Sequence, residues 1–130
     1  MSFDTIRRDI ENRVADNWMV TPVAYENAPF EEPQSEPWIR VRIFDDVTRR
    51  ITIGNPATYR HAGLLVLEIF TPKNSGTGTA RTYAGTLATL FRDVQFSGLT
   101  FREPSLSNGG EENGWFKMNL STPFFWDGQY

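Results

Sequence analysis

Residues 59–70 read YRHAGLLVLEIF, and the apolar end of this stretch decides the fold. Leu64–Phe70 is apolar at every position except Glu68. The run is too short for a comfortable helix, and Thr71-Pro72 closes it. A short continuous apolar run bounded by turn residues is typical of a strand that is covered on both faces. We therefore expect residues 59–70 to form the central strand of a sheet.

The residues before this strand predict further strands. Trp38–Phe44 alternates apolar residues with arginines, which is the two-residue period of a strand with one face in water. Asp45-Asp46 is typical of a turn, and the alternation resumes over Arg49–Ile53 until Gly54-Asn55-Pro56. The two segments can pair as a hairpin. A short edge strand is also expected around Val23–Tyr25, within a proline-rich connection.

Two amphipathic helices are expected, one at the start of the chain and one after the central strand. Ser2 can cap a first helix that ends near Asn17-Trp18, and its apolar positions recur every three or four residues. Lys73–Gly78 has the composition of a loop. Thr79 can then cap a second helix with a broad apolar stripe that ends near Arg92-Asp93.

The remaining residues complete a mixed architecture. Leu99–Phe101 is a predicted short strand, Ser107–Gly114 a polar turn and Trp115–Leu120 an alternating strand. We therefore predict an α+β fold: residues 1–130 form a single domain with a mostly antiparallel β-sheet and two α-helices packed on one face. The connection through the second helix can be a right-handed crossover. The order of the strands stays open.

Composition excludes several classes of function. The chain has 130 residues, no cysteine, a net charge of −3 and a pI near 5.1. A lack of thiols excludes cysteine nucleophiles, zinc fingers and disulfide scaffolds. The net charge of this acidic protein has the wrong sign for neutralising the phosphates of a nucleic acid, so general binding to nucleic acid is disfavoured. The sequence has no stretch like a membrane helix and no signal-peptide pattern at its start, so we expect a cytoplasmic protein without a membrane partner.

Catalytic and metal-binding patterns are sparse. His61 is the sole histidine, which removes catalytic triads and multi-histidine metal sites, and a structural or surface role is favoured for it. The carboxylate pairs Asp45-Asp46 and Glu111-Glu112 lie at predicted turns. Adjacent side chains on a strand point to opposite faces, so solvated turn residues are the favoured interpretation. The sequence indicates no catalytic residue and no metal site.

A glycine loop suggests a nucleotide site but lacks the required pattern. Gly76 and Gly78 lie between a predicted strand and a predicted helix, where phosphate can bind to the helix N-terminus. The dinucleotide fingerprint needs a glycine where this chain has Arg81, and the P-loop sequence is absent. We therefore expect a plain loop and no cofactor.

Two groups of residues are candidates for contacts with other subunits or with other proteins. Arginines are concentrated around the first strands, where they can face DNA in a ring, an acidic neighbour or only solvent. The apolar end of the chain can bind a partner, or it can add an edge strand and bury its rings in the chain's own core. The candidate residues are Arg49, Arg50, Arg60, Phe124, Phe125 and Trp126.

The order and spacing of short segments resemble one protein family over nearly the whole chain. The segments that carry the resemblance are Met1–Ile6, Val23–Phe30, Pro37–Val41, Arg60–Leu65, Ile69–Pro72, Gly76–Gly78, Leu90-Phe91, Phe96–Phe101, Gly114–Phe116 and Thr122–Phe124. The chain resembles the small tail terminator, or tail completion, proteins of siphophages and prophages.

The resemblance implies a structural and non-catalytic role. A member of this family is expected to form a ring, usually hexameric, on the tail tube, to stop tube polymerisation and to present a surface for head joining. Its implied partners are further copies of itself, the tail tube protein and the head–tail connector protein, with DNA only passing through the ring lumen. Its implied location is the virion tail, assembled in the bacterial host cytoplasm.

Two other classes of function stay open from the residues alone. A small binding module for a nucleotide or peptide would use the Gly76–Gly78 loop and exposed arginines. A hydrolase is the weakest alternative, because one histidine and no cysteine leave few catalytic combinations.

Overall fold

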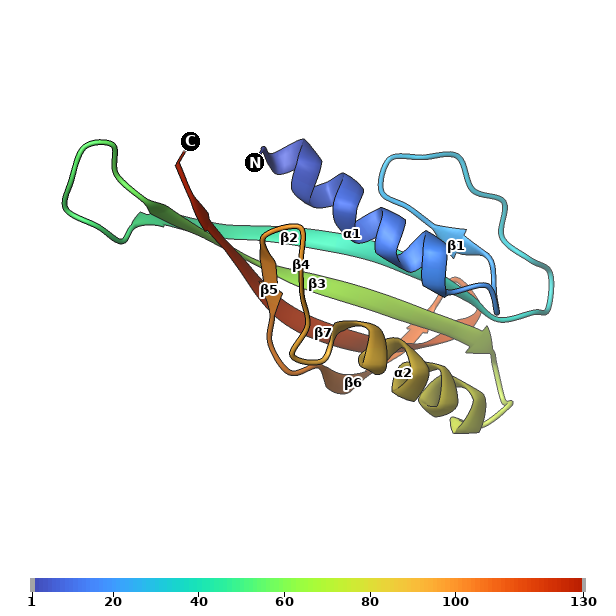
Figure 1. Ribbon diagram of the computed structural model, residues 1–130. Coiled ribbons are helices and arrows are strands. Elements are labelled where there is room, and N and C mark those ends of the chain that lie inside the picture. The colour runs from blue at the N-terminus through green and yellow to red at the C-terminus, as the bar shows by residue number, and fades with distance from the viewer. Residues whose placement is uncertain (1, 130) are drawn as a thin grey trace.

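A curled mixed sheet of seven strands organises the chain in the computed structural model, which describes residues 2–129 (Figure 1). The strand order is β1-β2-β3-β7-β5-β4, and β6 also pairs with β7. The β1–β2 pair is parallel and the other pairs are antiparallel. The strands are β1 (Val23–Ala24), β2 (Trp38–Arg50), β3 (Tyr59–Pro72), β4 (Gln95–Phe96), β5 (Leu99–Phe101), β6 (Ser105–Glu112) and β7 (Trp115–Gly128).

The predicted central strand is confirmed as β3. It pairs with β2 on one side and with β7 on the other. On one face Leu65, Leu67 and Ile69 are fully buried beneath the helices. On the other face Glu68 and Phe70 are buried by side chains of the neighbouring strands, with no helix above them. The continuous apolar run therefore reflects burial on both faces, although only one face has a second layer.

Both helices form close to where the sequence predicts them. Helix α1 spans Phe3–Asn17, and the Ser2 hydroxyl accepts a hydrogen bond from the Thr5 amide at 3.1 Å. Helix α2 spans Gly78–Phe91, so the predicted cap at Thr79 is wrong by two residues. The residue at the cap position, Thr77, makes no side-chain capping bond. Helix α2 therefore begins without a side-chain cap. Neither helix is long and apolar enough to cross a membrane.

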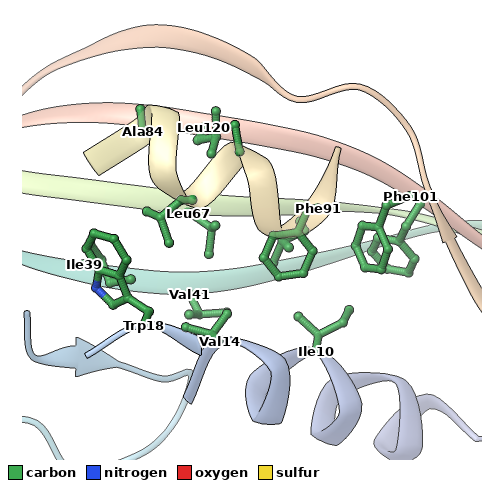
Figure 2. Packing of buried hydrophobic residues seen from close by; sticks show 14 of the residues in the cluster. Ile10, Val14, Trp18, Ile39, Val41, Leu67, Ala84, Phe91, Phe101 and Leu120 are labelled. Carbon is green, nitrogen blue, oxygen red and sulfur yellow. The ribbon is translucent and has the colours of Figure 1, made fainter. Parts of the chain in front are cut away.

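The two helices share one core on one face of the sheet, as predicted. Figure 2 shows Val14 of α1 and Phe91 of α2 directed toward Val41 and Leu67 of the sheet. All four side chains are fully buried. The helices also contact each other directly, because Arg13 of α1 donates a hydrogen bond to the Leu90 carbonyl oxygen of α2 at 2.8 Å. Just after α1, the Trp18 ring packs edge-on against Tyr83 of α2, with 5.3 Å between the ring centroids. The helices thus cover one side of the sheet, and the opposite side is here called the open face.

The predicted hairpin between residues 38 and 53 is wrong. Asp45-Asp46 does not turn the chain, because β2 continues through it to Arg50 and pairs with β3 throughout. The register shifts between Asp45 and Thr48, which marks a β-bulge. Only residues 51–58 form the connection, so Ile51–Ile53 is loop rather than strand. Polar residues that favour a turn are accommodated here by an extra residue in the strand.

The predicted polar turn Ser107–Gly114 is also mostly wrong. Residues 105–112 form strand β6, and only Asn113-Gly114 makes the turn into β7. Both turn residues have positive φ angles, which suits a tight hairpin turn. Strand β6 pairs with β7 through its backbone while most of its side chains face solvent, so its composition does not indicate a strand. Strand β7 continues beyond the predicted Leu120 to Gly128, so it includes the apolar end of the chain.

Candidate assembly surfaces

The β2–β3 hairpin projects beyond the rest of the molecule (Figure 1). Its end, residues 47–58, is here called the arm. Three apolar side chains of the arm are in solvent: Val47 is 50% exposed, Ile51 44% and Ile53 98%. A close group of exposed apolar side chains on a projection is typical of a surface that binds another protein. Of the three, only Ile53 is almost fully exposed to solvent.

Hydrogen bonds within the arm hold its loop in one shape. The Arg50 guanidinium donates to the carbonyl oxygens of Thr52 and Gly54 at 2.9 and 2.7 Å. The Thr58 amide donates to the Thr52 hydroxyl at 2.8 Å. The side chain of Arg49 is exposed and has no partner among residues 2–129. The loop is therefore ordered by its own polar groups, and the exposed side chains of Arg49 and Ile53 take no part in that order.

His61 makes hydrogen bonds with both its ring nitrogens at the base of the arm. Its ring is 1% exposed and lies at the bulge of β2. The Nε2 atom is 2.9 Å from an Asp45 carboxylate oxygen, and Nδ1 is 2.9 Å from the Thr48 hydroxyl. An ionised carboxylate can only accept, so Nε2 is the donor in the first bond. Phe3 packs edge-on against the ring at 4.9 Å. The contacts of His61 thus join β3 to the bulge of β2 and to Phe3 of α1.

Arg60 and Phe125 form a cluster on the open face. The Arg60 guanidinium makes two 2.8 Å bonds to the Asp127 carboxylate and lies 4.1 Å from the centre of the Phe125 ring. Arg102 lies 5.1 Å from the same ring. The hydrogen bond from Arg60 lowers the pKa of Asp127. These groups are half-buried or exposed, so the cluster remains open to a partner.

The other two rings of the predicted tail site belong to the core. Phe124 is 2% exposed and Trp126 is 8% exposed, on the face that the helices cover. The Phe124 ring lies over Gly63, where an added Cβ would come within 2.5 Å of it. The alternative that the tail buries its rings in its own core is therefore confirmed for these two residues. They pair inside the sheet rather than at an edge, because β7 lies between β3 and β5.

Four charged groups form a network on the open face. Glu68 accepts from Arg40 at 2.6 Å and from Lys117 at 3.2 Å. Glu112 also bonds both cations, at 3.1 and 3.2 Å. Burial alone would raise the pKa of Glu68, but the bonds from Arg40 and Lys117 outweigh it and the pKa is lowered. The charges compensate one another, so this network stabilises the sheet.

An acidic segment lies at the end of the sheet opposite the arm (Figure 1). Residues 26–37, here called the acidic loop, contain four glutamates and no basic residue. Phe30 packs on Trp38 at 5.0 Å, and the Glu26 carboxylate accepts from the Ile43 amide at 3.1 Å. These two contacts anchor the loop. Its other glutamates are exposed and have no partner among residues 2–129; they are Glu31, Glu32 and Glu36.

A hollow lies beside the acidic loop. It has a volume of about 380 Å³ and is lined on one side by Glu32, Pro33 and Gln34. Pro72 and Trp115, at the ends of β3 and β7, line its other side. We call this hollow the groove. Lys73 also lines the groove, but its ammonium group is paired with Glu111 at 3.3 Å. The Glu32 carboxylate has no such partner, so the groove suits a segment that is both apolar and basic.

The sequence motifs that suggested other chemistry are separated in space. Glu111 binds Lys73 at 3.3 Å, whereas Glu112 belongs to the charge network, so the two carboxylates point in different directions. Asp45 binds His61 and does not meet them. Within residues 2–129 no three metal-ligating side chains come together. Gly76 has a positive φ angle in the loop before α2.

Residues 5–124 match the family described as "Phage tail terminator protein". The chain belongs to the phage tail terminator family. A solved structure, labelled with a sequence number and no function, has 25% identity and a TM-score of 0.71; the match covers 97% of this chain and 96% of that one. No curated protein matches the chain. The predicted family is therefore confirmed, and the fold agrees with a known structure.

Membership of the phage tail terminator family gives the chain a structural role in the phage tail and in virion assembly. It implies contacts with other tail or head proteins. The surfaces available for such contacts in this tail terminator protein are the arm, the acidic loop with its groove, and the cluster around Phe125.

Part of these surfaces is indicated by the amino-acid sequence. The arm carries Arg49 and Arg50, which the sequence singles out, but its most exposed residue is Ile53, which was assigned to a strand. An isoleucine beside Gly54-Asn55-Pro56 was the available signal, because an apolar residue in a turn has no core to enter. The composition of the acidic loop predicts only a connection between strands. In the folded tail terminator protein, residues of this loop line the groove.

Proposed function

We propose that this tail terminator protein closes into a hexameric ring on the last ring of the tail tube, stops tube polymerisation and presents the surface that joins the head. In this proposal the protein acts without catalysis and assembles in the cytoplasm of the bacterial host. Its neighbours are further copies of itself, the tail tube protein and the head–tail connector protein. DNA meets it only while passing through the lumen of the ring.

The family match over residues 5–124 carries this proposal. The arrangement of surfaces adds support. The arm and the groove lie at opposite ends of the sheet and differ in charge and shape. Contacts between two unlike surfaces build rings when the rotation between subunits closes. Arg49 and Arg50 fit the proposal as contact residues on the arm, and Arg60 with Phe125 fits it as a second contact point.

The proposal is tested by observing the protein alone and on tail tubes. The purified chain is examined by negative-stain electron microscopy and analytical ultracentrifugation, and then added while tube protein polymerises. We expect closed rings, tubes that stop growing, and rings at one end of those tubes. A matched sample heated above its unfolding temperature controls for nonspecific effects on polymerisation.

A monomer that leaves tube growth unchanged would contradict the proposed function. If that monomer also bound a nucleotide or peptide with measurable heat, the chain would instead act as a binding module. A reproducible turnover that is lost on replacing His61 would contradict the absence of catalysis.

A further inference from the structure

The arm and the acidic loop have opposite charges. Residues 47–58 contain two arginines and no acidic residue, whereas residues 26–37 contain four glutamates and no basic residue. On the arm, Arg50 is used to order the loop and Arg49 is free. On the acidic loop, Glu31 and Glu32 are exposed and free. Complementary charge of this kind favours association and fixes its orientation.

The two surfaces also complement each other in apolar content. Ile53 is 98% exposed at the end of the arm, a position that leaves an apolar side chain in water without any benefit to the fold. The groove offers the half-buried rings of Pro33 and Pro72 and the exposed edge of the Trp115 indole, which is only 8% exposed. Burial of an isoleucine side chain strengthens association by about tenfold or more, which is enough to make Ile53 an anchor.

One chain cannot bring its own arm to its own groove. Strand β3 runs from the arm to the groove, and its 14 residues span about 43 Å at the usual rise of a strand. Hydrogen bonds to β2 and β7 on both sides make that strand a rigid spacer. The complementary surface must therefore belong to another molecule, and a second copy of this chain supplies it.

On the basis of the proposed ring, we infer that the arm of each subunit seats in the groove of the next. Ile53 fills the hollow between Pro33 and Trp115, and Arg49 faces Glu31 and Glu32. The contact is head-to-tail, because each subunit donates its arm at one end and accepts an arm at the other. His61 positions the arm for this contact by holding Asp45 and Thr48 at the bulge.

Cysteine cross-linking tests this contact directly, because the natural chain has no cysteine. The variant G54C, Q34C places one thiol beside Ile53 and one in the groove. An added Cβ at Gly54 meets nothing closer than 3.9 Å, and Gln34 is exposed, so the fold is expected to tolerate both changes. A short bismaleimide is added to assembled protein. The control variant G54C, T86C moves the second thiol to an exposed position of α2.

We expect a ladder of covalent oligomers that stops at the ring size for G54C, Q34C, and no ladder for the control. Rings that show no ladder would overturn the inferred contact and leave the proposed function intact. Dimers formed by G54C alone would also overturn it, because they show arms meeting each other. A chain that forms neither rings nor cross-links would contradict both proposals.

A charge exchange provides a second readout. Either R49E or E32R alone is expected to raise the concentration needed for half-assembly about fivefold, the effect of losing one exposed ion pair of about 1 kcal/mol. The variant with both changes is expected to recover most of the loss, because the pair is restored with reversed signs. Equal losses that simply add in the double variant would contradict a direct contact between these residues.

Discussion

The helix-covered core and the arm use the same kinds of residue in opposite ways. In the core, side chains such as Phe91 and Leu67 are fully buried between helices and sheet. In the arm, Ile51 and Ile53 are exposed, and polar groups rather than apolar ones hold the loop together. The core therefore determines whether the chain folds. The arm contributes little to folding, and its apolar side chains are exposed in the single subunit.

The largest expected effect comes from a cavity in the core. Phe91 is fully buried, and its ring packs against that of Phe101 with 5.0 Å between the ring centroids. Replacing it by alanine removes this packing, and F91A is expected to lower the free energy of unfolding by about 3–5 kcal/mol. Urea unfolding followed by tryptophan fluorescence measures the change. A loss no larger than that of an arm variant would contradict the division between core and arm.

A smaller effect on the free energy of unfolding is expected from the charge network. Apart from Glu68, its side chains are more exposed than those of the core and less exposed than the exposed apolar side chains of the arm. The variant E68Q leaves Arg40 and Lys117 without their buried partner, and we expect a loss of about 1–3 kcal/mol near neutral pH.

The pH dependence of the stability follows from the carboxyl group of Glu68. The pKa of Glu68 is lower in the folded protein, so the unfolded chain binds more protons as the pH falls. The stabilisation is present above the unfolded pKa of about 4.3 and is lost as the pH falls through the folded pKa. Thermal unfolding between pH 7 and pH 3 should therefore show a shallower decline for E68Q than for the natural chain. Equal slopes would contradict this role of Glu68.

The smallest expected effect on stability comes from the arm. I53S is expected to change the free energy of unfolding by no more than about 0.5 kcal/mol, because the side chain is almost fully exposed. The same change should weaken ring assembly about tenfold, measured by sedimentation, since the anchor is lost. The matched variant I53V keeps an apolar side chain and should assemble normally. Normal assembly of I53S would contradict the role of the arm.

The buried parts of the fold were predictable because burial leaves a pattern in the sequence. Residues 64–70 gave the central strand, and the three- and four-residue spacing gave both helices. Strand β6 was missed because its pairing uses backbone groups and, apart from Leu106, it carries only polar residues and glycines. The bulge at Asp45 was missed because it depends on His61, which lies sixteen positions away in the sequence. Such long-range bonds leave no local signal.

The interaction surfaces were only partly predictable for the same reason. Arg49 and Arg50 lie on the arm, but the groove combines residues from three separate parts of the chain. Its lining residues come together only when β3 and β7 end beside the acidic loop. The aromatic tail was ambiguous in sequence because alternation places Phe124 and Trp126 on the helix side and Phe125 on the open face.

Hydrogen–deuterium exchange of free and tube-bound protein tests most directly whether the arm is built for assembly. In the free protein, amides of residues 52–57, which donate no hydrogen bond within the arm, should exchange fast, and those of β3 slowly, since β3 is paired on both sides. On assembly, residues 52–57 and residues 31–36 should both become protected while β3 is unchanged. Arm amides that exchange equally fast in the free and assembled states would contradict the account.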